Sequence, residues 1–401
     1  MHSLLLTALF FPVLINPQIK NRAEPTIDAH PASYSFGIEM IFTASVHSSE
    51  AILKAQLIVQ EGFSRPSSSP AEVSGSEDFS LSIRRNLETE PLFPFSSMGY
   101  WWEVELSSGR KLISGMQTVQ YSDDRFSWRR YEKGRAAVEW VEGDSSAAEN
   151  AAELMLLALG TISADLEAPI PDRAVLYIYP RLAEFRSALG NRIRGWEGAM
   201  SDPASGIILL AAASGAEGRR PLAVLLPHEI VHILLGAKWK SACTLLPLWL
   251  VEGMAAGYEM EPRPEADQAL RQAARAGGLI PLQTLCTVFP AEESSAMLAY
   301  AESKSFVAFL KETYGLAAVR QAMAAYADGA ECGHGLETST GRTLSELELV
   351  WSDRLGSGDP WLSSSWEMVL AGVALLAGVL AVRWMIQHPH INLPWKKGKA
   401  E

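Results

Sequence analysis

Two histidines and a glutamate with the spacing H-E-x-x-H lie just past the middle of the chain. They are His228, Glu229 and His232, within the stretch LPHEIVHILLG at residues 226–236. Positions i and i+4 of an α-helix share one face, so both histidines can bind one metal ion, with Glu229 beside a metal-bound water. The apolar neighbours predict a buried helix, in which Pro227 is tolerated if it lies in the first turn. Burying these polar groups without partners would be costly, which favours a metal site.

A second candidate ligand follows in the stretch LPLWLVEGMAAGYE at residues 246–259. Glu252 lies 20 positions after His232, a spacing that lets a second helix run back beside the first and present its carboxylate. Two histidines, one glutamate and a water form the open, four-coordinate site of catalytic zinc. We expect Gly253 and Gly257 to let the two helices approach closely, with a simple packing role as the alternative.

The pair HEIVH and WLVEGMAAGYE resembles the gluzincin metallopeptidases, in particular the bacterial peptidase MA-like group, over about residues 135–355. The resemblance implies a thermolysin-like α+β zincin domain that binds one catalytic Zn²⁺ and hydrolyses peptide bonds. It implies that Glu229 is the general base and that the zinc ligands are His228, His232 and Glu252. Many relatives carry a carboxylate four residues after the glutamate ligand. This chain has Ala256 there, and we expect Glu259 on the same helical face to replace it.

Further parts of the active site are expected on both sides of the two motifs. Tyr300, in the stretch LAYAESKS, resembles a tyrosine-rich segment of the relatives and is a candidate oxyanion donor, with a core tyrosine as the alternative. His334, in a glycine-rich loop, is a weaker candidate. We predict that residues 206–213 form an edge strand for an extended substrate. No GxMEN-like segment is recognised before His228, which favours an endopeptidase.

The secondary structure expected from the sequence falls into two domains. Short strands separated by Gly, Pro and Ser clusters, such as the cluster at residues 64–76, predict an N-terminal antiparallel β-sandwich over residues 30–125. Residues 123–133 are expected to link it to the domain at 135–355, where strands and helices mix at first and helices then dominate. Amphipathic helices are predicted at residues 303–314 and 316–327.

The two ends predict the topology. Residues 1–24 are interpreted as a signal peptide, because an apolar run of about 12 residues is too short to span a bilayer. Residues 366–386 would form a helix of about 30 Å, which matches the hydrocarbon core. The tail at 387–401 contains three lysines and is expected in the cytoplasm. We therefore expect a single-pass protein of the cell membrane with its catalytic domain outside the cytoplasm.

Composition limits the partners and leaves alternatives open. The net charge of −12 argues against a nucleic-acid partner, since phosphates would meet no broad basic face, so a peptide or protein substrate is expected. Cys243, Cys286 and Cys332 permit one disulfide plus a free thiol, or none. A zinc-stabilised, non-catalytic module that binds a partner at the cell surface is the alternative function. An intramembrane metalloprotease is disfavoured, because no apolar span of about 20 residues flanks the HExxH helix.

Overall fold

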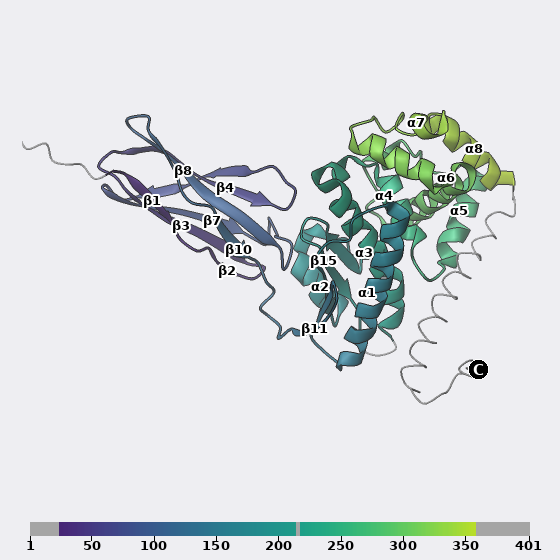
Figure 1. Cartoon of the computed structure of the whole chain (residues 1–401), viewed down its shortest axis with the longest axis horizontal. Helices are drawn as coiled ribbons and strands as arrows, with labels where there is room; N and C mark the ends of the chain where they lie inside the picture. Colours follow the sequence, from purple (N-terminus) through teal and green to yellow (C-terminus); the bar gives the residue numbers. More distant parts are fainter. Residues whose placement is uncertain (1–23, 214–216, 358–401) are drawn as a thin grey trace, which may run out of the picture.

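A computed structural model describes residues 24–213 and 217–357 as an N-terminal β-sandwich followed by a mixed sheet and a helical lobe (Figure 1). The sandwich and the helical peptidase-like part therefore agree with the predicted fold class. The predicted signal peptide (residues 1–24, of which only Glu24 is described), the membrane helix at 366–386 and the basic tail at 387–401 lie outside the described residues.

The sandwich consists of two antiparallel sheets. In the first, the strand order is β1–β3–β7–β6 and β2 also pairs with β3; in the second, it is β10–β8–β4–β5 and β9 also pairs with β8. Alternate residues of β3 and β8 are buried between the sheets, as the two-residue period of a strand requires. The strands are β1 (Thr26–Ala29), β2 (Ser33–Ser35), β3 (Glu39–His47), β4 (Ile52–Glu61), β5 (Ser67–Pro70), β6 (Glu72–Ser74), β7 (Asp78–Asn86), β8 (Ser97–Leu106), β9 (Lys111–Ile113) and β10 (Gln117–Gln120).

Two parts of the strand pattern differ from the prediction. The Ser-rich cluster at residues 64–76 contains the short edge strands β5 and β6, whose residues are all exposed and so carry no burial pattern. The segment expected to be a linker at 123–133 contains strand β11 (Arg129–Lys133), which pairs with β12 (Ala136–Trp140). The second sheet-containing unit therefore starts six residues before position 135.

The sandwich packs directly on the following domain. Its core is continuous with residues of strand β13 (Ala174–Tyr179) and helix α2 (Leu182–Leu189). At the junction the buried carboxylate of Asp123 accepts hydrogen bonds from Arg125 and, at 3.0 Å, from the Tyr179 hydroxyl. The two units are therefore held together by an apolar core as well as by a buried polar contact.

The third sheet has the order β11–β12–β13–β15–β14. Its three middle strands are parallel, whereas β11 and β14 (Ala199–Asp202) are antiparallel edges. Strand β15 is Ile207–Ala211, and the short η1 helix (Gly190–Arg192) follows α2. Helices α1 (Ser145–Leu166) and α3 (Arg219–Trp239) share one apolar core with this sheet, and α2 belongs to the core shared with the sandwich.

The helical lobe follows α3. It contains η2 (Lys240–Leu245), α4 (Leu248–Gly257), α5 (Pro264–Ala276), η3 (Thr284–Cys286), α6 (Glu293–Ala327), α7 (Glu337–Thr340) and α8 (Leu344–Ser357). The two predicted amphipathic helices both lie in α6, which begins at Glu293, ten residues before the first of them, and is broken at Gly315 by a backbone φ of 83°. Glycine tolerates this conformation, which other residues rarely adopt.

Two details of the motif helices differ from the sequence expectations, and only the packing alternative for Gly253 holds. Helix α3 begins at Arg219, so Pro227 lies in its interior and not in the first turn. Gly253 packs against the backbone of Ser303 in α6 rather than against α3, and a Cβ on Gly257 would meet nothing within 4 Å. The glycine of α3 that allows a close approach is Gly236, which lies against Pro203 in the turn after β14.

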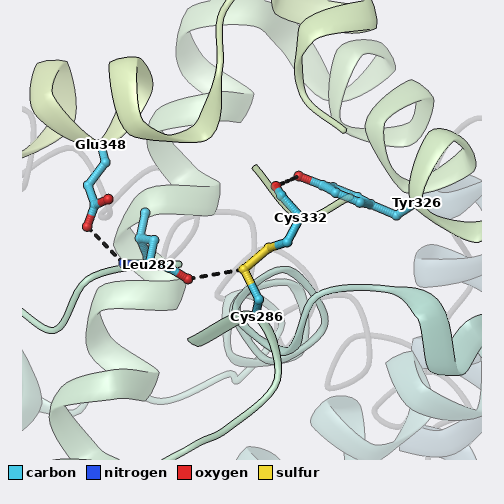
Figure 2. Close-up of a disulfide and its surroundings, with 5 residues drawn as sticks. All are labelled: Leu282, Cys286, Tyr326, Cys332 and Glu348. Atoms are coloured by element: carbon cyan, nitrogen blue, oxygen red, sulfur yellow. Dashed lines mark hydrogen bonds between the residues drawn. A yellow bond between two sulfur atoms is a disulfide. The ribbon is translucent and has the colours of Figure 1, made fainter. Parts of the chain in front are cut away.

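A disulfide joins Cys286, at the end of η3, to Cys332 in the loop after α6 (Figure 2). Cys243 is a free thiol. Figure 2 shows the surrounding anchors: the Glu348 carboxylate accepts from the Leu282 backbone N–H at 2.8 Å, and the Tyr326 hydroxyl donates to the Cys332 carbonyl at 2.9 Å. The disulfide therefore fixes the chain just before residues 287–289.

Within the described residues, one helical stretch, Arg219–Leu245, is long and apolar enough to cross a membrane. It contains α3, and 61% of its most apolar window is buried inside the protein. Its apolar residues belong to the same core as α1 and α4. This burial accounts for its composition as that of a core helix.

Candidate metal centre and substrate cleft

Helix α3 places His228 and His232 one turn apart, with their ring centroids 5.2 Å from each other. The helix packs against the sheet, α1 and α4, so most of its apolar residues are buried. His228 is 9% exposed and Glu229 is 7% exposed. The HExxH motif therefore lies on a buried helix, as predicted.

Helix α4 brings the third expected ligand to the two histidines. Glu252 Oε2 lies 3.3 Å from His228 Nε2 and 3.8 Å from His232 Nε2. One ligand atom from each of the three residues lies within 4.8 Å of the others. Bonds of about 2.0–2.1 Å to a tetrahedral Zn²⁺ would separate ligand atoms by about 3.3 Å, so the spacing fits this ion.

The hydrogen bonding of these groups also fits a cation. Glu252 Oε2 is buried and accepts no hydrogen bond, although buried carboxylate oxygens ordinarily have partners. A metal ion between the oxygen and the two imidazoles would satisfy it. Two nitrogens and one carboxylate oxygen, with a cleft on the open side, form a donor set typical of catalytic zinc.

The charges around the ligands point the same way. Burial lowers the pKa of His228, but Glu252, Glu259 and Glu229 outweigh it and raise the pKa to about 10. For Glu252, burial acts to raise the pKa, and His232, His228 and Arg194 outweigh it and hold the pKa below its ordinary value. A concentration of negative charge that favours the imidazolium would equally favour a divalent cation.

Glu259 contacts the other nitrogen of His228. Its Oε1 lies 3.3 Å from His228 Nδ1, off the hydrogen-bond direction, and 2.9 Å from an Arg263 nitrogen. Helix α4 ends at Gly257, so Glu259 does not continue the helical face, contrary to expectation. It nevertheless occupies the place expected of a carboxylate that orients a histidine ligand.

The proline inside α3 explains how Glu259 reaches this place. Pro227 has no backbone N–H, which leaves the carbonyl of Ala223 without its helical partner. The backbone N–H of Met260 donates to that carbonyl at 3.3 Å. This bond attaches the chain just past α4 to helix α3, with Glu259 next to His228.

The side chain of Glu229 is hydrogen-bonded to the edge strand of the sheet. The Ser201 hydroxyl, on β14, donates to Glu229 Oε2 at 2.6 Å. Ser201 was not among the predicted site residues, because a four-residue strand leaves almost no periodic signal.

The predicted edge strand was wrong. Residues 207–211 form β15, which pairs with β13 on one side and β14 on the other, and β14 is the edge. The sequence at 198–202 is GAMSD. It keeps the glycine and methionine of the GxMEN pattern, contrary to the expectation that no such segment precedes His228, and has Ser201 in place of the glutamate.

Of the two further candidates, Tyr300 lies beside the candidate metal ligands, whereas His334 lies elsewhere. Tyr300 comes from α6, and its ring centroid is 6.1 Å from that of His228 and 5.1 Å from that of Phe289. Burial, followed by Glu252, Glu197 and Glu229, raises the pKa of Tyr300, so its hydroxyl keeps its proton at neutral pH. His334 is exposed and bonds to Glu337 at 2.8 Å in the loop after α6, outside the residues that line the cavities.

Two adjoining cavities of about 290 and 360 Å³ open beside the candidate ligands. They share Glu197, Met200, Glu252 and Tyr300. The first contains the HExxH residues and the whole of β14 except its last residue. The second extends past Arg192 and Arg194 to the wall at residues 287–289, which directly follows Cys286. Together they form a cleft along the edge strand, with the candidate metal ligands at its base.

In this fold the HExxH helix and the helix that follows it bring three candidate metal ligands together at one point. A family model for the Peptidase MA superfamily matches residues 152–356, about half of the chain. The chain belongs to the Peptidase MA superfamily, as its two motifs indicated.

Solved structures give more distant similarities. An M1 zinc metallopeptidase variant from Deinococcus radiodurans, bound to a Tyr-Ser-Ala substrate, is 14% identical over 82% of this chain and 93% of its own, with a TM-score of 0.37. An aminopeptidase N family protein from Idiomarina loihiensis is 9% identical over 94% and 77%, with a TM-score of 0.36. OgpA from Akkermansia muciniphila, in complex with an O-glycopeptide, is 13% identical over 24% of this chain, with a TM-score of 0.19.

The chain covers 29% of OgpA. No curated protein matches the sequence.

Proposed function

We propose that this protein is a zinc-dependent peptidase whose ligands are His228, His232 and Glu252. The observation that carries the proposal is the convergence of these three groups at the base of a cleft, next to a buried Glu229. Pure metal binding would require only the ligands. The buried Glu229 carboxylate is a fourth group beside them, and its position facing a cleft bordered by an edge strand supports hydrolysis.

The chain's own groups have distinct roles in this reaction. Zn²⁺, when bound, supplies Lewis acidity toward a carbonyl oxygen and lowers the pKa of a water ligand. Glu229 accepts a proton from the attacking water and passes it to the leaving amine. Tyr300, protonated at neutral pH, donates a hydrogen bond to the developing oxyanion. Glu259 orients His228, because a carboxylate at the second imidazole nitrogen fixes the ring and its tautomer.

The edge strand gives the cleft its substrate class. A strand with one unpaired edge binds extended peptides through main-chain hydrogen bonds. The residue of β14 that bonds Glu229 is a serine, so the strand offers no carboxylate there to bind a free amino terminus. This supports cleavage within a peptide rather than removal of its first residue. Fluorogenic peptides with a blocked and a free amino terminus separate the two activities, and exclusive cleavage of the free form would contradict endopeptidase action.

The test of the peptidase activity compares Glu229→Gln with the unchanged protein. Glu265→Gln, on the exposed start of α5, is the matched control. We expect zinc to stay bound in all three proteins and cleavage of an unfolded protein to be lost only in Glu229→Gln. Zinc binding without cleavage by the unchanged protein would instead favour the non-catalytic binding module.

We also propose that the catalytic part works outside the cytoplasm, attached to the membrane by residues 366–386. The proposal rests on the apolar sequence of that segment and its basic tail. The disulfide Cys286–Cys332 supports it, since disulfides persist mainly in oxidising compartments. Protease added to intact cells should digest the catalytic part while sparing the tail. Full protection of the catalytic part would contradict this topology.

A further inference from the structure

Strand β14 has two orientations of backbone groups. The Ala211 N–H donates to the Gly198 carbonyl at 2.9 Å, and the register continues antiparallel from Ala199↔Leu210 to Asp202↔Ile207. Hydrogen-bonded and non-bonded pairs alternate in such a ladder. Residues 200 and 202 therefore bond to β15, whereas Ala199 and Ser201 direct their N–H and C=O groups away from the sheet.

The side chains of β14 alternate as well. Met200 packs in the core shared with the sandwich, whereas Ala199 packs against the core that contains α3. Ser201 is on the same side of the strand as Ala199, and its hydroxyl bonds to Glu229 Oε2 at 2.6 Å. Ser201 thus offers its main chain to an extended peptide and its side chain to the candidate general base.

The position of β14 relative to α3 is fixed by packing. Gly236 of α3 lies against Pro203, directly after the strand, and a Cβ at this glycine would overlap Pro203. On the other side, Gly62 of the sandwich lies close to Ala204: a Cβ added at this glycine would be 3.0 Å from the Ala204 Cβ. The hydroxyl of Ser201 is therefore held at a set distance from Glu229 by contacts on both sides of the turn.

We infer that Ser201 is a positioning residue for the general base and couples it to substrate pairing along the edge strand. This inference rests on the proposed function. Held by Ser201 through one oxygen, the Glu229 carboxylate keeps its other oxygen for the proton that it transfers. A peptide that pairs with the main chain of Ser201 then lies in register with that oxygen.

Ser201→Ala removes the hydroxyl and leaves the main chain in place. We expect kcat to fall about 10- to 100-fold, the cost of a misplaced catalytic group, while KM stays within about twofold and zinc content is unchanged. Ser201→Thr keeps a hydroxyl and suits a strand, so it should restore kcat to within a few-fold. The matched control is Ser205→Ala, in the turn after the strand, where the serine bonds Asp202 rather than Glu229.

A crystal structure of zinc-loaded Ser201→Ala gives a readout that does not depend on turnover. We expect the Glu229 carboxylate to leave its position beside residue 201 or to lose order, with β14 unmoved. An unmoved, ordered carboxylate would overturn the inference even if the protein proved not to be a peptidase. In an active enzyme, unchanged or higher kcat in Ser201→Ala, or failure of Ser201→Thr to restore kcat, would also overturn it.

Discussion

The replacement of Glu259 by glutamine tests whether this carboxylate serves the metal centre from a position beyond the end of α4. The side chain is 3% exposed and lies between His228 Nδ1 and the Arg263 guanidinium. Glutamine keeps the size and can still accept a hydrogen bond, but it loses the negative charge. The imidazole would then keep a neutral neighbour at Nδ1 but lose the negative charge that raises its basicity as a ligand.

The expected size of the effect follows from this contact. Partners of metal ligands typically contribute 10- to 100-fold to metal affinity, which corresponds to about 1.4–2.8 kcal/mol. The 3.3 Å separation and the off-line geometry place Glu259→Gln near the lower limit. Glu259→Ala, which also leaves a gap, should approach the upper limit. Both changes weaken zinc binding, so the apparent dissociation constant rises.

Zinc affinity can be measured by competition with a chromophoric chelator, independently of peptide cleavage. The control is Glu261→Gln, two residues further along, whose carboxylate pairs with Arg220 at the surface and is 40% exposed. A zinc affinity of both Glu259 variants within twofold of the unchanged protein would refute the role of Glu259. Equal losses in the Glu261 control would show a general effect of charge instead.

Three further predictions concern the frame around the site. Gly253→Ala places a methyl group against the Ser303 carbonyl and should lower the free energy of unfolding by about 1–3 kcal/mol in urea titrations. Gly257→Ala, in open space, should change it by less than about 1 kcal/mol, and equal values for the two variants would contradict the packing. Reducing Cys286–Cys332, which are 46 positions apart, should lower the free energy of unfolding by up to about 4 kcal/mol. It should also raise KM more than it lowers kcat, because the cleft wall follows Cys286. An unchanged melting temperature and an unchanged KM would argue against this. Burial raises the pKa of Glu302 to about 8, above its value in the unfolded chain. The folded state therefore binds the extra proton, and stability falls as pH rises from about 4.5 to 8. Glu302→Gln should remove this pH dependence of the melting temperature, and a dependence equal to that of the unchanged protein would refute the assignment.

The convergence of the three candidate ligands was predictable because their signal is local and periodic. HExxH on a helix fixes the relative positions of two ligands, and the apolar run around it fixes the helix as buried. Glu252 needed only a second helix of the right length, which WLVEG supplies. The sandwich was likewise predictable, since β3 and β8 alternate buried and partly exposed residues over nine and ten positions.

The missed features depend on tertiary contacts. Strand β14 has four residues, all of intermediate exposure, so its alternation is invisible in the sequence. The apolar run at 206–213 has the stronger strand pattern and therefore attracts the prediction of an edge strand, although such runs typify strands that are buried on both faces of a sheet. Pro227 fits the interior of α3 because a distant N–H, that of Met260, bonds the freed carbonyl. Three cysteines allow three pairings, and only packing selects Cys286 with Cys332.

Anomalous diffraction at the zinc edge, from crystals of the zinc-loaded full chain, tests the central claim most directly. We predict one zinc ion per chain, bound by His228 Nε2, His232 Nε2 and a Glu252 carboxylate oxygen, with its open side facing the cleft. A folded protein without anomalous signal at these residues, or with zinc bound elsewhere, would contradict the account.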